Sequence, residues 1–133
     1  MPISKHLLAS AMLSIAALVA PLAQHVHAQN APVATGPAIY VSEFEITDPE
    51  GMKPYSARVE ASFVTFGGHY IVRGGAVVSQ EGAPSKRIVM IEFPSMERAL
   101  AWYDSPAYAE LKPIRHKAAT SRVYTVQGTP HVP

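Results

Sequence analysis

The chain contains no cysteine, which excludes disulfide bonds, thiolate zinc sites and a cysteine nucleophile. It also has no excess of either charge, with 11 lysine and arginine residues against 10 aspartate and glutamate residues. No basic stripe interrupts this balance, so nucleic acid is not an expected partner. A small domain without disulfide bonds must be held together by its hydrophobic core or by a partner chain.

No hydrophobic run is long enough for a membrane span. The uncharged stretch of residues 7–20 stops at Pro21 and is shorter than the roughly 20 apolar residues that a bilayer requires. Lys5 precedes this stretch and a small-residue end follows it, which is the layout of a secretory signal peptide over residues 1–28. We therefore expect an exported protein, periplasmic or secreted, with no membrane contact after cleavage behind Ala28.

The remainder of the chain is expected to form one small domain with short flexible ends. Residues 29–37 and 129–133 are rich in proline and small residues and have no apolar period, so they are expected to be a linker and a tail. Residues 38–128 carry all the periodic apolar patterns. Their length suits a single domain and no more.

Apolar periodicity predicts the order strand, helix, strand, strand, helix, strand for this domain. The expected strands are residues 38–46, 69–80, 86–93 and 121–128, and the expected helical segments begin near residues 49, 96 and 106. This order is the split βαβ or ferredoxin-like plan, an α+β fold with a four-stranded antiparallel sheet.

Glycine and proline mark the expected ends and bends. Gly67-Gly68 is expected to end the first helix, and Gly74-Gly75 suggests a bulge or bend inside one long second strand. Pro54 indicates either a loose first turn or a helix that begins only there. Pro113 is expected to kink the last helical segment. Neither glycine pair is followed by the lysine and hydroxyl of a phosphate-binding loop.

Both faces of the predicted sheet are apolar. In the first strand, for example, Tyr40 points to one face and Ile39 and Val41 to the other. Helices cover only one face in the ferredoxin-like plan, so the second face needs another cover. A second copy of the chain is the simplest cover, and we expect a homodimer through the sheet face. A bound ligand layer or a different partner is the alternative.

Three stretches resemble a known family. They are GGHYIVRGG (67–75), VMIEFPSMERALAWYDSPAY (89–108) and LKPIRHKAATSR (111–122). They are similar to the signature stretches of domain-of-unknown-function family 1330, in the dimeric α/β-barrel superfamily, here with an added signal peptide. The resemblance implies the same fold and the same dimer. It brings no established activity, because that superfamily includes monooxygenases, isomerases and dehydratases.

Arg73 and Glu92 are the first candidates for chemistry. Arg73 lies where the second strand is expected to bend, and bulges often redirect side chains toward sites. It is either the ion-pair partner of Glu92 on the neighbouring strand or an arginine that binds a carboxylate. Glu92 lies among apolar residues, a setting that suits acid–base work if no partner neutralises it.

Aromatic residues near the second helix are further candidates. Trp102, Tyr103 and Tyr108 form a cluster that is either core or the lining of a ligand pocket. His69, beside a glycine, is a candidate base. The histidines show no metal-ligand spacing, so we expect neither a metal site nor a cofactor.

Two functions of different class follow. The first is a small dimeric exported domain that binds a small apolar or carboxylated molecule, or has a structural role. The alternative is a cofactor-free enzyme of isomerase, lyase or monooxygenase type, acting on a small cyclic substrate by proton transfer. Glu92 or His69 would move the proton, and Arg73 would steady negative charge. Catalysis requires these residues and Tyr103 to converge on one open cavity.

Overall fold

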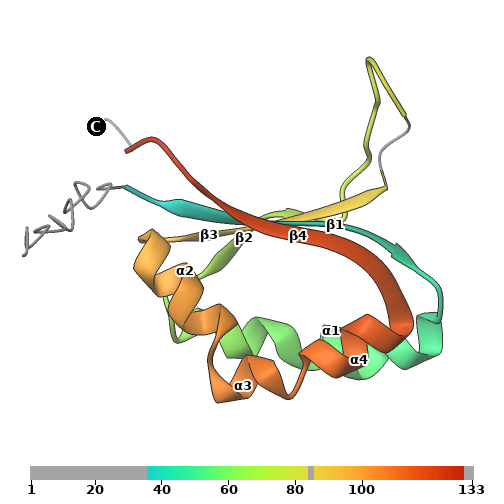
Figure 1. Cartoon of the computed structure of the whole chain (residues 1–133), viewed down its shortest axis with the longest axis horizontal. Coiled ribbons are helices and arrows are strands. Elements are labelled where there is room, and N and C mark those ends of the chain that lie inside the picture. The colour runs from blue at the N-terminus through green and yellow to red at the C-terminus, as the bar shows by residue number, and fades with distance from the viewer. Residues whose placement is uncertain (1–35, 84–85, 131–133) are drawn as a thin grey trace, which may run out of the picture. The chain divides into compact units, whose positions relative to one another are not determined.

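In the residues that the structure describes, a four-stranded antiparallel sheet has the helices on one face (Figure 1). The structure, a computed structural model, describes residues 36–83 and 86–130. The elements are β1 (Ala38–Ile46), α1 (Pro49–Val64), β2 (His69–Arg73), β3 (Arg87–Phe93), α2 (Met96–Tyr103), α3 (Pro106–Ala109), α4 (Lys112–Ala118) and β4 (Ala119–Gln127).

The strand order is β2-β3-β1-β4, which is the ferredoxin-like arrangement. The predicted α+β fold class is therefore confirmed. The predicted signal peptide, residues 1–28, lies outside the described residues. Within the part of the chain that the structure describes, no helix combines the length and apolarity needed to cross a membrane.

Helix α1 begins at Pro49, near the predicted residue, and continues through Pro54. The Asp48 side chain caps it by accepting a hydrogen bond from the Gly51 backbone nitrogen at 3.0 Å. Pro54 cannot donate to the carbonyl of Glu50, but both residues are exposed, so water can bind that carbonyl. The alternative in which the helix begins only at Pro54 is therefore wrong, because the helix begins at Pro49.

The first glycine pair ends α1, as predicted. Gly67 has a φ of 80°, a left-handed conformation that glycine adopts without steric cost. The Gly68 backbone nitrogen donates to the Phe63 carbonyl oxygen at 3.1 Å. A Cβ atom on Gly68 would lie 2.7 Å from the Phe93 ring. The pair therefore both turns the chain and allows β2 to pack closely against the core.

The second glycine pair does not bend a long strand, which corrects the prediction for residues 69–80. Strand β2 ends at Arg73, and its irregularity lies between Tyr70 and Val72, where Ile71 is extra. A bulge of this kind moves every following side chain to the other face of the sheet. Arg73 is therefore paired with Val89 and points toward the helices.

The chain between β2 and β3 forms an arm, defined here as residues 75–83. It rises from the sheet on the side opposite the helices (Figure 1). All its residues are exposed, including Val78, which is 76 % exposed. At its base, the Gly74 backbone nitrogen donates to the Ile88 carbonyl oxygen at 2.9 Å.

The last helical segment is broken rather than kinked at Pro113. It divides into α3 and α4, and Pro113 lies in the first turn of α4, where its missing backbone donor costs no helical hydrogen bond. In α4 the structure buries Arg115, and Ile114 is half-buried.

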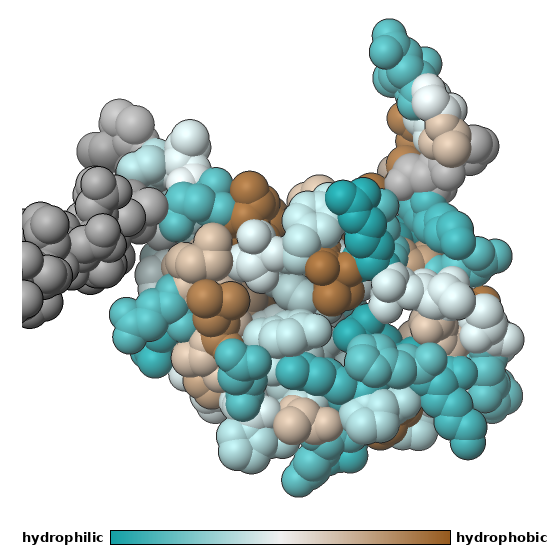
Figure 2. All heavy atoms as spheres, viewed as in Figure 1, coloured by the Kyte–Doolittle hydropathy of each residue, from teal (hydrophilic) through white to brown (hydrophobic). Residues whose placement is uncertain are grey.

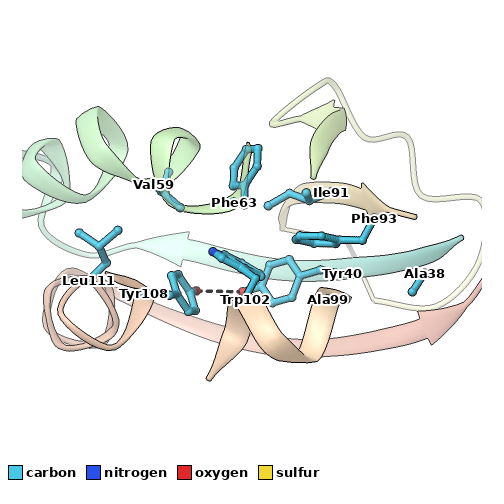
Figure 3. Close-up of a cluster of buried hydrophobic side chains, with 10 residues drawn as sticks. All are labelled: Ala38, Tyr40, Val59, Phe63, Ile91, Phe93, Ala99, Trp102, Tyr108 and Leu111. Atoms are coloured by element: carbon cyan, nitrogen blue, oxygen red, sulfur yellow. Dashed lines mark hydrogen bonds between the residues drawn. The ribbon is translucent and has the colours of Figure 1, made fainter. Parts of the chain in front are cut away.

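The core lies between the sheet and the helices (Figure 3). Trp102 is fully buried between the rings of Phe93 and Tyr108, with centroid distances of 5.3 Å and 4.2 Å. Its Nε1 atom donates to Ser62 Oγ at 3.0 Å, so the indole has no unsatisfied polar group.

The other face of the sheet has no helix over it, and we call it the open face. Its central row is apolar and pairs Met90, Val41 and Tyr124 across three strands. Polar pairs lie toward both ends, with Tyr124 Oη donating to Glu43 Oε1 at 3.0 Å and His69 Nε2 lying 3.6 Å from Glu92 Oε1. The open face comprises Ile39, Val41, Glu43, His69, Val72, Ile88, Met90, Glu92, Arg122, Tyr124 and Val126.

Candidate functional site

A cavity of about 270 Å³ lies between the sheet and α1. Strands β1 and β3 form one wall, and α1 forms the facing wall through residues spaced three and four apart. Pockets for drug-sized ligands measure about 300–1,000 Å³, so this cavity suits a smaller molecule. Its lining residues are Tyr40, Ser42, Phe44, Ile46, Met52, Tyr55, Ser56, Val59, Tyr70, Arg73, Gly74, Arg87, Val89, Ile91 and Arg115.

Three tyrosine hydroxyl groups meet at the wall of this cavity. Tyr108 Oη lies 3.4 Å from Tyr40 Oη and 3.3 Å from Tyr55 Oη, and Figure 3 shows the first of these contacts. Tyr108 is held in place because Ser105 caps α3, with its Oγ accepting from the Tyr108 backbone nitrogen at 3.2 Å. Each hydroxyl group has one hydrogen to donate. The three hydroxyl groups have three hydrogens, and the two hydrogen bonds among them use only two.

Tyr40 and Tyr55 stay protonated at neutral pH. Burial raises the pKa of both hydroxyl groups well above the ordinary value, and the neighbouring Tyr108 raises each of them further. Burial also raises the pKa of Tyr70 at the same cavity. The cavity thus presents neutral hydroxyl groups that can donate hydrogen bonds to a ligand.

Arg115 places a buried positive charge against the cavity. The residue is only 3 % exposed. Its Nη1 atom donates to Ser121 Oγ, and its Nη2 atom lies 3.1 Å from His116 Nε2, which accepts when the ring is neutral. Its Nε atom is buried and has no hydrogen-bond partner among the residues that the structure describes.

No carboxylate of the described residues pairs with Arg115. Burial acts to lower the pKa of Arg115, but the neighbouring tyrosine hydroxyl groups outweigh burial and raise it, so the guanidinium stays charged. A buried charge without a counter-ion is costly. The arrangement therefore favours an anion inside the cavity.

Two more arginines extend the positive charge to the exposed part of the cavity. Arg87 on β3 and Ser121 on β4 both pair with Phe44 of β1, from its two sides. Ser121 is the hydrogen-bond partner of Arg115. Arg73 Nη1 lies 3.1 Å from Glu60 Oε2, and both of these side chains are exposed. Among the described residues, three arginines and no acidic residue line the cavity, so its potential attracts negatively charged ligands.

The two candidate proton-transfer residues lie away from this cavity. Glu92 and His69 are register partners on the open face. They line a separate, more open hollow at the end of the sheet, beside Pro94. The ion pair predicted between Arg73 and Glu92 is wrong, because the bulge in β2 places Arg73 on the helix side, where it pairs with Glu60.

The aromatic candidates lie behind the cavity wall. Trp102 is enclosed in the core and does not line the cavity. Tyr103 packs against Tyr108 at a distance of 5.5 Å between ring centroids. Lys112 Nζ lies 3.8 Å from the centroid of the Tyr103 ring. Tyr108 is fully buried and contacts the cavity-lining tyrosines through its hydroxyl group. Of the predicted site residues, Arg73 alone lines the cavity.

Sequence reasoning missed Tyr40, Tyr55, Arg87 and Arg115. Only Arg115 left a usable signal, since it occupies a position on an otherwise apolar helical face, four residues after Leu111 and three before Ala118. A charged residue at such a position is rarely buried without a reason.

The arrangement of sheet and helices makes this chain a ferredoxin-like α+β protein, and several solved structures are similar to it. The RPA0582 protein of unknown function from Rhodopseudomonas palustris has 18 % identity and a TM-score of 0.57, over 73 % of this chain and 85 % of that chain. SnoaB, a cofactor-independent oxygenase from Streptomyces nogalater, has 14 % identity and a TM-score of 0.51, over 74 % and 98 %.

A dimeric ferredoxin-like protein of unknown function from Thermobifida fusca has 11 % identity and a TM-score of 0.50, over 76 % of this chain and 99 % of that chain. Identities this low establish a shared fold and no shared activity. Residues 37–129 match the family described as domain of unknown function DUF1330, so the chain belongs to that family. No curated protein matches the chain.

Proposed function

We propose that the protein binds a small, largely apolar molecule in the cavity between the sheet and α1. The single observation that carries this proposal is the lining itself. Aliphatic and aromatic walls surround a few convergent polar groups, which is the usual composition of a small-molecule site. Three arginines at the wall of a cavity are costly in a protein core that binds nothing.

Ligand binding should appear as thermal stabilisation. A molecule that prefers the native state raises stability by about 2.7 kcal/mol at a free concentration one hundred times its Kd. We therefore expect members of a panel of small aromatics, lactones and acids to raise the melting temperature of the protein, measured at fixed protein concentration.

The matched variants Ser56→Trp and Ala57→Trp test the location. Ser56 lines the cavity, whereas its exposed neighbour Ala57 does not. Ser56→Trp is expected to abolish the stabilisation, and Ala57→Trp is expected to preserve it. Equal responses of the two variants, or a panel without any stabilising molecule, would contradict the proposal.

A homodimer through the open face is the second part of the proposal. An apolar central row between polar ends is the usual anatomy of a protein interface, and Tyr124 and Val126 of this face are 40 % and 47 % exposed. The arm stands on the same side of the sheet (Figure 1). Its exposed Val77 and Val78 would then contact the partner copy. Figure 2 shows a few separate hydrophobic residues on the sheet and in the arm, with hydrophilic residues between them.

Export to the periplasm or the medium completes the proposal. Its support is the signal-peptide layout of residues 1–28. N-terminal sequencing of the protein from its producing cells is expected to begin at Gln29. Material that begins at Met1 or Pro2 would show that the segment is retained.

The alternative, a cofactor-free enzyme, is not favoured. It requires Glu92 or His69 to share a cavity with Arg73, and the sheet separates them. Trp102 and Tyr103 also stand outside the cavity lining. The candidate acid–base residues lie instead on the face proposed for the dimer.

A further inference from the structure

We propose that Arg115 is the anion-binding residue of the cavity and that the ligand is a small carboxylate with an apolar body. This inference rests on the proposed binding function and names its ligand class. The cavity limits the body to about one or two rings, because it is smaller than the sites of drug-sized ligands.

The guanidinium of Arg115 has free donors that match a carboxylate. An arginine side chain carries five N–H donors. Ser121 and His116 take one each, and the Tyr108 hydroxyl oxygen is a third acceptor beside the guanidinium. The Nε atom has no partner although it is buried. Together with a neighbouring N–H it can hold both oxygens of a carboxylate in two parallel hydrogen bonds.

The surroundings of Arg115 favour a carboxylate with an apolar body over an inorganic anion such as phosphate. A neutral tyrosine hydroxyl group can donate to the same carboxylate, since three hydroxyl hydrogens serve only two bonds among Tyr40, Tyr55 and Tyr108. The remaining wall includes Val59 and Ile91, which favour an apolar body. Inorganic phosphate satisfies the charge but leaves this wall uncovered, so it is expected to bind weakly.

Titration with matched acids and amides tests the inference. The probes are benzoate and cinnamate, each compared with its neutral amide of nearly the same shape, and inorganic phosphate. Hydrogen bonds to a charged group favour the acid by about tenfold or more in Kd. Isothermal titration calorimetry on the full dimeric protein measures this ratio.

Variants of Arg115 locate the preference. Arg115→Gln is expected to reduce the ratio of amide Kd to acid Kd to about one, and Arg115→Lys to leave an intermediate ratio, because lysine keeps the charge without the planar fork. Arg98→Gln removes the same charge from the exposed surface of α2 and is expected to leave the ratio unchanged. Melting temperatures without ligand show whether each variant is folded.

The outcomes separate this inference from the function on which it rests. Amides that bind as tightly as acids, in a manner that Ser56→Trp abolishes, would keep the binding function and overturn the role of Arg115. The same holds if Arg115→Gln and Arg115→Lys fold and both retain the full preference. Phosphate that binds as tightly as benzoate overturns the carboxylate assignment, and a panel in which no probe binds overturns both proposals.

Discussion

Lysine at both Met90 and Val126 is expected to convert the proposed homodimer into monomers. Both residues lie on the open face, Met90 in its central row and Val126 beside it, with 47 % of Val126 exposed. A two-fold interface would place four lysines among the apolar side chains of the open face. Burying an unpaired charge costs several kcal/mol, so the dimer Kd should rise by at least about a hundredfold.

Analytical ultracentrifugation at micromolar concentration measures this change. The monomer should remain folded, because a lysine on an exposed sheet face can extend its charge into water. The control variant Val64→Lys with Leu100→Lys changes two exposed apolar residues, at 55 % and 48 %, on helices α1 and α2. It is expected to stay dimeric. An unmodified protein that sediments as a monomer, or a dimer that only the control disrupts, would refute the open-face interface.

Alanine at Trp102 is expected to lower the free energy of unfolding by about 3–5 kcal/mol. The indole is fully buried, contacts the rings of Phe93 and Tyr108, and donates to Ser62. Its removal leaves a large void that the surrounding strands and helices cannot fill. Because small domains are stable by only about 5–15 kcal/mol, much of the native population would be lost at elevated temperature.

Chemical denaturation at fixed protein concentration measures the loss, and Trp102→Phe serves as the matched variant. Phenylalanine keeps most of the ring volume, so its effect should be clearly smaller. The prediction also separates core from site, because the sequence suggested Trp102 as a ligand-binding residue. A decrease in the free energy of unfolding below about 1 kcal/mol, combined with weaker ligand binding, would indicate that Trp102 is a ligand-binding residue and not a core residue.

Local signals predicted the elements of the fold well. The β-branched and aromatic run of residues 38–46 coincides with β1, and the helix predicted to begin near residue 96 coincides with α2, which Ser95 caps. These elements follow from propensity and capping, which act within a few residues. Pro54 was misleading because the carbonyl group that it leaves without a partner is on the solvent side of α1, where it costs little.

The site was harder to predict because it depends on one irregular residue and on distant contacts. The bulge at Ile71 reverses the face on which Arg73 lies, and no glycine or proline marks that position. The contact between Tyr55 and Tyr108 joins residues 53 positions apart. Periodicity placed Arg115 near an apolar face, but only the packing of α4 against the sheet shows that its charge is buried beside a cavity.

The most direct test of the binding site is an NMR titration that follows the arginine Nε–H signals during addition of benzoate. The Nε–H group of Arg115 has no protein partner in the described structure, so a carboxylate in the cavity must change its resonance and slow its exchange with water. We predict that this signal and the backbone signals around Tyr55 shift together and saturate. Shifts confined to the open face around Tyr124, with the Arg115 signal unchanged, would contradict the cavity as the binding site.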